Sequence, residues 1–205
     1  MINFQDKVNF IWSIAELLRG PYKKEQYGDV ILPMAVLRRF DCVLAPTKEE
    51  VLKKYEALKK SGLQNVDPIL NRISKQEFNN VSKYDFEKLL ADPDNIASNL
   101  RNYINGFSKN AREIIEHFDF DKHITKLDDN NLLYLVVSQF NKLDLHPDKV
   151  SNTEMGYIFE ELIRRFSEHG EAGDHYTPRE VIKLMVNILL NEDKEQLTQL
   201  GLVTT

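Results

Sequence analysis

The residues best suited to ligand chemistry lie near the end of the chain, in the stretch GDHYTPREVIKLMV. Thr177, Pro178 and Glu180 in this stretch match a capping box. In that motif the threonine side chain accepts a hydrogen bond from the third helical N–H, and the glutamate reaches back to the threonine N–H. Proline is favoured at the first helical position, which needs no N–H. The stretch therefore predicts a helix that begins at Thr177.

The three residues just ahead of the cap, Asp174, His175 and Tyr176, have no role in starting that helix. A helix N-terminus presents free N–H groups and a positive dipole end, which suit a carboxylate or a phosphate. An adjacent aromatic ring can pack against such a ligand. A small anionic or zwitterionic ligand is one interpretation of this segment, and a plain helix start is the other.

Other familiar constellations are missing from the sequence. There is no GxGxxG, no Walker loop and no HExxH. The five histidines have no metal-like partners, because Cys42 is the single cysteine, and we predict no metal site. We expect His117 and His123 to cap helices or face solvent, and Glu160-Glu161 to lie on a solvated helix flank. No self-contained active site can be assembled from these residues.

Composition sets broad limits on the class of protein. The chain has 205 residues, of which 42% are hydrophobic and 29% are charged, so it can bury a core. This length fits one sizeable domain, or a domain and part of a second. A lone cysteine excludes an intramolecular disulfide and fits a reducing cytoplasm. Charged residues interrupt the apolar N-terminal stretch, which is therefore neither a signal peptide nor a membrane span.

The charge of the chain is unevenly distributed. Residues 1–150 hold 22 basic and 22 acidic side chains, whereas residues 151–205 hold five basic and ten acidic ones. These totals predict no strongly basic face for binding phosphates. The basic pairs are typical of solvated helix faces; they are Lys23-Lys24, Arg38-Arg39, Lys53-Lys54 and Lys59-Lys60.

Apolar spacing predicts a mainly α fold. Helical patterns cover residues 8–18, 23–44, 48–61, 94–107, 110–118 and 129–143, while residues 64–93 are less regular. Pro33 should kink or start the second helix. We expect Thr47 to open a capping box, and residues 128–131 to cap a helix through LLYLVVSQF, which a buried strand would also fit by composition.

The best domain boundary lies in LDLHPDKVSN, Leu143–Asn152, where Pro147 breaks the helical pattern. Ser151, Asn152 or Thr153 can cap the helix that follows. That helix, EMGYIFEELIRRF, carries an apolar face of Met155, Ile158, Phe159, Leu162, Ile163 and Phe166. We therefore expect one domain over residues 1–150 and the start of another over residues 151–205.

Several long segments together resemble a known family. EMGYIFEELIRRF, the polar loop after it and GDHYTPREVIKLMVNIL resemble the modification (methylase) subunit of type I restriction–modification systems. YGDVILPMAVLRRFDCVL is similar to the helical N-terminal domain of these subunits. LDDNNLLYLVVSQFNKLDLHPDKVSNTEMGYIFEELIRRF is similar to the end of that domain and the junction after it. The resemblance covers nearly the whole chain.

The resemblance implies a cytoplasmic adenine-N6 DNA methyltransferase that uses S-adenosylmethionine. Implied partners are a second methylase subunit, a specificity subunit, a restriction (nuclease) subunit and double-stranded DNA, with no membrane. It also implies that one segment borders the methionine end of the cofactor; the residues are Asp174, His175, Tyr176, Thr177, Pro178 and Arg179. The helix-start chemistry of this segment agrees with that role.

Methylases of this family continue with a strand, a DPxxGxGG-like loop and an NPPF or NPPY motif, and none of the motifs occurs here. The resemblance therefore implies leading helices of a truncated Rossmann-like methyltransferase domain after a helical N-terminal domain. We expect an excised N-terminal portion with no catalytic residue of its own, inactive alone and supplying one wall of the cofactor site. Its helical domain should serve subunit assembly and DNA enclosure.

Two alternatives remain open at this stage. One is a stand-alone helical protein-interaction module without an enzymatic parent. The other is the methylase region of a single-chain restriction–methylation enzyme, which fusion to a nuclease domain would distinguish.

Overall fold

The fold is mainly α, as predicted. The computed structural model describes residues 4–60, 65–167, 177 and 179–190. The chain divides into two compact units, residues 1–169 and residues 170–205. Within the described residues, β structure is limited to two isolated bridges. The α-helices are α1 (Phe4–Ala15), α2 (Gly28–Leu44), α3 (Lys48–Lys60), α4 (Asp67–Ser74), α5 (Phe86–Leu90), α6 (Ile96–Asn105), α7 (Lys109–Glu116), α8 (Asp121–Asp129), α9 (Leu133–Asn141), α10 (Asn152–Ser167) and α11 (Arg179–Leu190).

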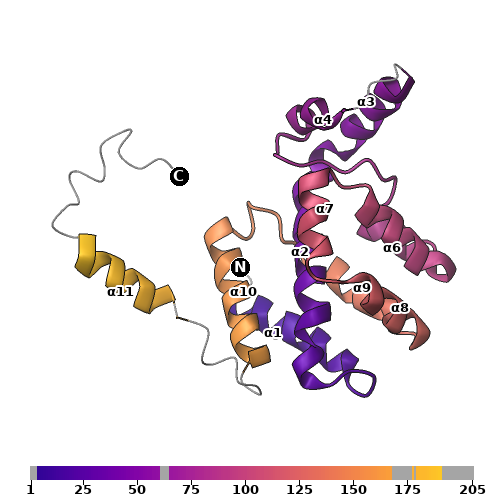
Figure 1. The fold of residues 1–205 in the computed structure, drawn as a ribbon. Helices are drawn as coiled ribbons and strands as arrows, with labels where there is room; N and C mark the ends of the chain where they lie inside the picture. The colour runs from indigo at the N-terminus through magenta and orange to yellow at the C-terminus, as the bar shows by residue number, and fades with distance from the viewer. Residues whose placement is uncertain (1–3, 61–64, 168–176, 178, 191–205) are drawn as a thin grey trace. The chain divides into compact units, whose positions relative to one another are not determined.

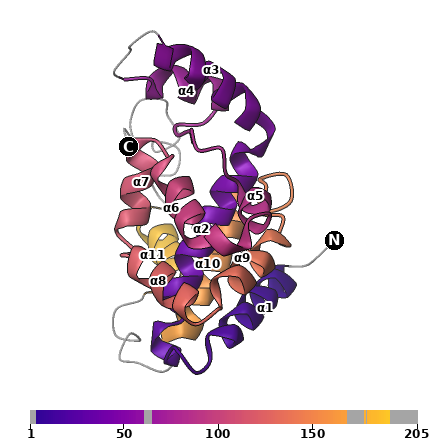
Figure 2. The ribbon, with the colours of Figure 1, turned by 90° about the vertical axis from the view of Figure 1, so that its right-hand side faces the viewer.

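The first unit is built around α2, which contacts α1, α9 and α10 (Figures 1 and 2). Its buried side chains include Ile31, Met34 and Leu37, which are fully enclosed. Burying each such side chain contributes about 1.5–3 kcal/mol. The helix begins at Gly28, because Lys24–Gln26 form a separate 3₁₀ turn. Pro33 lies inside α2 rather than at its start, so one intrahelical hydrogen bond is missing there.

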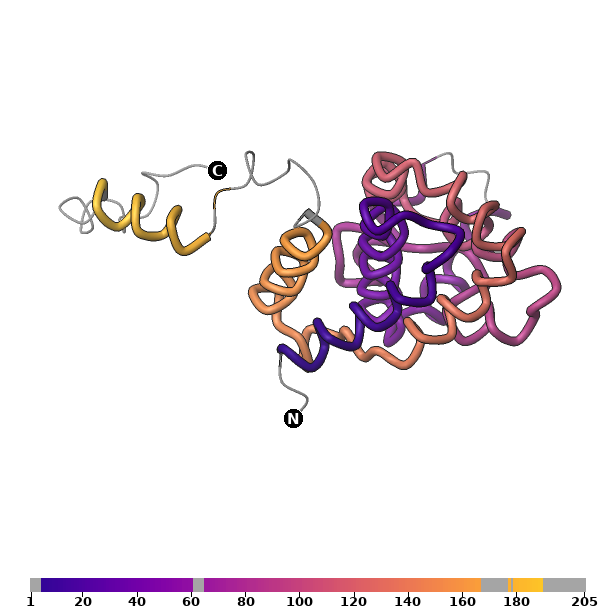
Figure 3. Tube along the Cα trace, turned by 90° about the horizontal axis from the view of Figure 1, so that it is seen from below, coloured from indigo at the N-terminus to yellow at the C-terminus, as the bar shows by residue number. Residues whose placement is uncertain are grey.

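The helix α10 packs against α1 and α2 within the first unit (Figures 1 and 3). Met155, Ile158 and Leu162 are buried in this contact region, as their spacing predicted, whereas Ile163, expected on the same face, is 38% exposed. The ring of Phe166 stacks on Trp12 with 5.4 Å between centroids. Residues 152–167 are therefore packed into the same unit as the helices that precede residue 150.

A capping box starts α10, and its cap is Ser151, one of the three candidates from the sequence. The Ser151 backbone N–H donates to Glu154 Oε2 at 2.8 Å, and the Glu154 N–H donates to Ser151 Oγ at 3.2 Å. Each side chain thus satisfies a backbone donor that the helix itself cannot. These two residues therefore cap the start of α10.

Two other predicted caps are wrong. Thr47 lies in a 3₁₀ turn that joins α2 to α3, and its hydroxyl donates to the Leu44 carbonyl at 3.3 Å. The residue before α9 is Leu132, with no side-chain cap, because α8 already occupies residues up to Asp129. The segment LLYLVVSQF is nevertheless helical, as predicted.

A buried polar segment, residues 79–82, lies against the end of α6. The Val81 N–H donates to the Gly106 carbonyl at 2.8 Å, and the Asn80 side-chain amide donates to the Tyr103 carbonyl at 2.9 Å. The Asn80 side-chain oxygen in turn accepts from the Ser82 N–H at 2.8 Å. These bonds replace water for backbone groups that the core would otherwise leave unsatisfied.

Candidate functional site

The predicted cofactor segment falls mostly outside the described residues. Asp174, His175, Tyr176 and Pro178 lie outside them. Thr177 is exposed, and Arg179 is half-buried and begins α11. The predicted helix is therefore present within two residues of its expected start, and the role of the segment stays a prediction.

The apolar side chains of α11 are exposed in the structure. Ile188 and Leu189 are 70% and 71% exposed, and Leu184 is 59% exposed. Their spacing along the sequence is typical of a packed helix face, yet within the described residues they are not buried. Glu180 lies in the first turn of α11, where a negative charge interacts favourably with the helix dipole.

A polar pocket of about 300 Å³ lies in the first unit, between α2, α3, α5 and α6. Arg38 Nη1 lies 2.7 Å from Asp41 Oδ2, and the Tyr103 hydroxyl donates to Asp41 Oδ1 at 3.3 Å. Lys48 Nζ lies over the Tyr103 ring, 5.5 Å from its centroid. Sequence reasoning missed this cluster, because its members come from helices far apart in the chain.

Burial shifts the protonation of the pocket residues. Desolvation lowers the pKa of Lys48 to about 8, although Asp41 and Asp85 favour its charged form. Desolvation also raises the pKa of Asp41, and the Arg38 guanidinium opposes that change. Lys48 Nζ donates to Asn80 Oδ1 at 3.0 Å, which ties α3 to the buried polar segment. The role of Lys48 in this geometry is structural, because its ammonium group is directed at an acceptor within the protein.

The interpretation of Arg38-Arg39 as a solvated helix face is wrong. Arg39 is 8% exposed and the Arg38 side chain is 14% exposed. Arg39 occupies the apolar face of α2, four residues after Ala35 and three before Cys42. That spacing was the signal in the sequence, because residues three and four apart share one helix face. The other three basic pairs are exposed, as expected.

His123 is also misplaced by the sequence interpretation, which expected it to cap a helix or face solvent. It is 5% exposed and its ring stacks on Tyr22 with 5.7 Å between centroids. Neither ring nitrogen has a hydrogen-bond partner among the described residues. Burial lowers the pKa of His123, although Asp29 opposes this, with Oδ2 3.9 Å from Nε2. His117 behaves as expected, since it is exposed at the end of α7.

Two further observations bound the chemistry of the described residues. Among them, no group of histidine, cysteine and carboxylate side chains could hold a metal ion. Nor is any described helix both long enough and apolar enough to cross a membrane.

Comparison with known proteins places these features in a family. Residues 7–140 match the family described as HsdM N-terminal domain, and residues 150–200 match the family described as N-6 DNA Methylase. The chain is 29% identical over 94 residues to the type I restriction enzyme EcoEI methylase subunit of Escherichia coli. That alignment spans 46% of this chain and 19% of the relative's length. Because the first match covers well over half of its residues, the chain belongs to the HsdM N-terminal domain family, whose members form the N-terminal portion of type I methylase subunits.

Proposed function

We propose that this chain is the N-terminal part of an S-adenosylmethionine-dependent adenine-N6 DNA methyltransferase subunit in a type I restriction–modification complex. The order of the two family matches carries the proposal, because the helical family comes first and the methylase family begins at residue 150. The methylase relative from Escherichia coli supports the same parent.

The proposed cofactor segment is Asp174 to Arg179, ahead of and at the start of α11. The 12-residue helix α11 begins there, and the positive end of a helix dipole suits the carboxylate at the methionine end of the cofactor. The exposed Thr177 is compatible with such contact. The cofactor itself supplies the methyl group, and the role of these residues is to bind and orient its methionine end.

We further propose that the helical domain serves assembly with the specificity subunit, a second methylase subunit and the restriction subunit, and helps to enclose DNA. The complex would act in the cytoplasm. The balanced charge of residues 1–150 supports a role in protein contacts over autonomous DNA binding. The proposal also places the boundary between the helical domain and the methylase domain at residue 150.

The proposal is tested in a chain that continues through a complete methylase domain, assembled with its specificity subunit. We expect transfer of a labelled methyl group to duplex DNA, recovered as N6-methyladenine after digestion to nucleosides. Residues 1–205 alone should transfer none and bind the cofactor weakly, because a site with one wall leaves the ligand exposed to water. Transfer to cytosine, or no transfer by the assembled complex, would overturn the proposal.

Tyr176→Ala in the extended protein tests the segment itself. We expect weaker cofactor binding by calorimetry and slower methyl transfer, with unchanged thermal stability, since Tyr176 precedes the cap. Tyr134→Ala is the matched control, because Tyr134 is an exposed tyrosine on α9. Unchanged cofactor affinity in Tyr176→Ala would show that the segment only starts a helix and does not bind the cofactor.

A further inference from the structure

The junction between the two family matches is not a free tether. Its buried side chains anchor it to the first unit, since Leu145 is fully buried and Val150 is 1% exposed. The Leu145 N–H donates to Cys42 Sγ at 3.5 Å. A segment outside helices must find other partners for its backbone carbonyls. In this junction, the guanidinium groups of Arg38 and Arg39, both on α2, donate to several of these carbonyls.

Arg38 binds the last residue of α9 and the second residue after it. Its Nη2 donates to the Asn141 carbonyl at 2.9 Å, and its Nε donates to the Leu143 carbonyl at 2.8 Å. Its remaining arm pairs with Asp41 at 2.7 Å. The planar guanidinium thus directs donors to two carbonyls and a carboxylate at once, which a lysine ammonium cannot do in the same geometry.

Arg39 holds the other half of the junction. Its Nη1 donates to the Leu145 carbonyl and, at 2.7 Å, to the Val150 carbonyl. Its Nη2 donates to Asn152 Oδ1 at 2.7 Å, and Asn152 is the first residue of α10. One side chain therefore bridges both ends of the junction and the helix that follows it.

Burying Arg39 has an energetic cost that these acceptors must offset. A charge removed from water destabilises the folded state unless its donors are satisfied. Desolvation accordingly lowers the pKa of Arg39. Its acceptors in the junction are carbonyl and amide oxygens, so moving the junction away would leave a buried cation with unsatisfied donors. The arrangement favours one path of the junction over all others.

We propose that Arg38 and Arg39 form a latch that fixes the path of residues 141–152 and the position at which α10 begins. They are positioning residues, through which α2 of the first family region controls the first helix of the second. This inference needs no cofactor and no DNA, so it stands or fails independently of the proposed methylase function.

Amide hydrogen exchange of the whole 205-residue chain, resolved by residue, tests the latch. In Arg39→Met we expect the Lys149 and Val150 amides, both bonded to the His146 carbonyl at 2.9 Å, to exchange faster. The expected change is about tenfold or more, corresponding to loss of a hydrogen bond from a charged donor. Amides in α6 and α8, far from the junction in sequence, should keep their protection. Arg39→Lys should show a smaller change in the same amides.

Arg101→Met is the matched control, because Arg101 also donates to a carboxylate and a hydroxyl, those of Asp121 and Thr125. It should leave the junction amides unchanged. If Arg39→Met does not fold, Asn152→Ala removes one acceptor of the latch and Arg39→Lys weakens the donor. Their effects on junction exchange should be less than additive when combined, because both break one contact. Unchanged junction exchange, fully additive effects or an equal rise in exchange everywhere would overturn the latch.

Discussion

Position 106 requires glycine, because a side chain there would clash with Ser82. A Cβ there would lie 2.6 Å from Ser82 Cβ and 2.7 Å from the Ser82 backbone nitrogen. Backbone cannot move aside as the end of a long side chain can, so Gly106→Ala should destabilise the chain by about 1–3 kcal/mol. Urea unfolding followed by circular dichroism measures this loss.

Gly28→Ala is the control for that substitution. Its Cβ would lie 3.4 Å from Phe166 Cδ2, which is ordinary van der Waals contact. The stability of Gly28→Ala should therefore stay within about 0.5 kcal/mol of the unchanged chain. If the two alanine variants were equally stable, the close approach of Gly106 to Ser82 would not affect the free energy of unfolding.

His123 should make the stability of the chain depend on pH. Burial lowers its pKa in the folded state, so between about pH 6.5 and that lower value the unfolded chain binds a proton that the folded chain does not. Stability should therefore fall as the pH drops below about 6.5, and His123 should contribute no pH dependence above that range. His123→Phe keeps an aromatic ring against Tyr22 and cannot titrate.

The measurement is urea unfolding of both proteins between about pH 7.5 and about pH 5, the window around the unperturbed histidine pKa. The unchanged chain should lose more stability over this window than His123→Phe does. Parallel stability curves would show that His123 titrates equally in the folded and unfolded states.

At the scale of the element, the cap of α10 can be tested through the single tryptophan. Ser151→Ala removes the hydroxyl that accepts from the Glu154 N–H and should cost about 1 kcal/mol. Because Trp12 stacks on Phe166 of α10, its fluorescence reports whether α10 is packed on α1. Unfolding followed by Trp12 emission should shift to lower urea. Ser98→Ala, at an exposed serine of α6, should leave the midpoint nearly unchanged.

The sequence predicted helices with a regular apolar repeat better than helices without one. The expected helices at 94–107 and 110–118 appear as α6 and α7, because their apolar residues recur at helical spacing. Helix α8 was missed, because only two of its nine residues, Ile124 and Leu127, are aliphatic and it follows a short turn. Helix α4 was missed because it begins with Asp67-Pro68, a pair typical of turns; Pro68 here lies in the first helical turn, where its missing N–H costs nothing.

The candidate site was harder to predict than the helices. The segment at Thr177 was found because capping is a local signal, readable from neighbouring residues. The Arg38–Arg39 contacts join residues more than 100 positions apart, and no local pattern reports them. A basic pair on a helix is usually solvated, so its burial becomes apparent only when the junction is seen packed against it.

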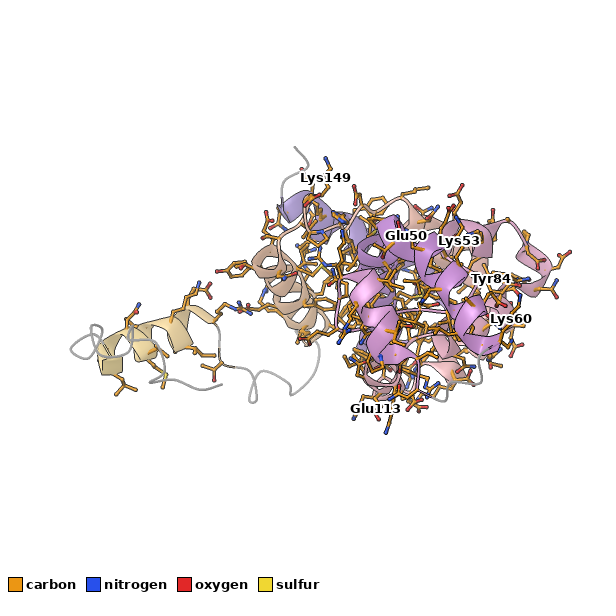
Figure 4. The ribbon with its side chains drawn as sticks, turned by 90° about the horizontal axis from the view of Figure 1, so that it is seen from above. Glu50, Lys53, Lys60, Tyr84, Glu113 and Lys149 are labelled. Atoms are coloured by element: carbon orange, nitrogen blue, oxygen red, sulfur yellow. The ribbon has the colours of Figure 1, made fainter. Side chains whose placement is uncertain are left out.

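At the scale of the whole molecule, charge predicts weak DNA binding by the chain alone. The net charge is −5 and α3 mixes both signs, with Glu50, Lys53 and Lys60 along one helix (Figure 4). Non-specific affinity depends on the number of phosphates neutralised, so binding to duplex DNA should be weak with a shallow salt dependence. Fluorescence anisotropy at several salt concentrations measures both quantities.

A charge-changed chain provides the positive control. Replacing Glu49, Glu50 and Glu56 by lysine makes α3 basic throughout, and it should add salt-dependent binding. Tight, steeply salt-dependent binding by the unchanged chain would mean that its basic side chains already form a DNA-binding face.

The packing of α10 bears on how relatives of this protein can be recombined. The methylase family match begins at residue 150, yet α10 is buried against α1 and α2, within residues 1–169. A chimera joined at residue 150 would pair α10 of one parent with the Trp12 surface and the Arg39 guanidinium of another. Both the aromatic stack and the guanidinium contacts would then have to match across parents. A crossover placed after Ser167 would transfer α10 together with the helices it was selected to fit.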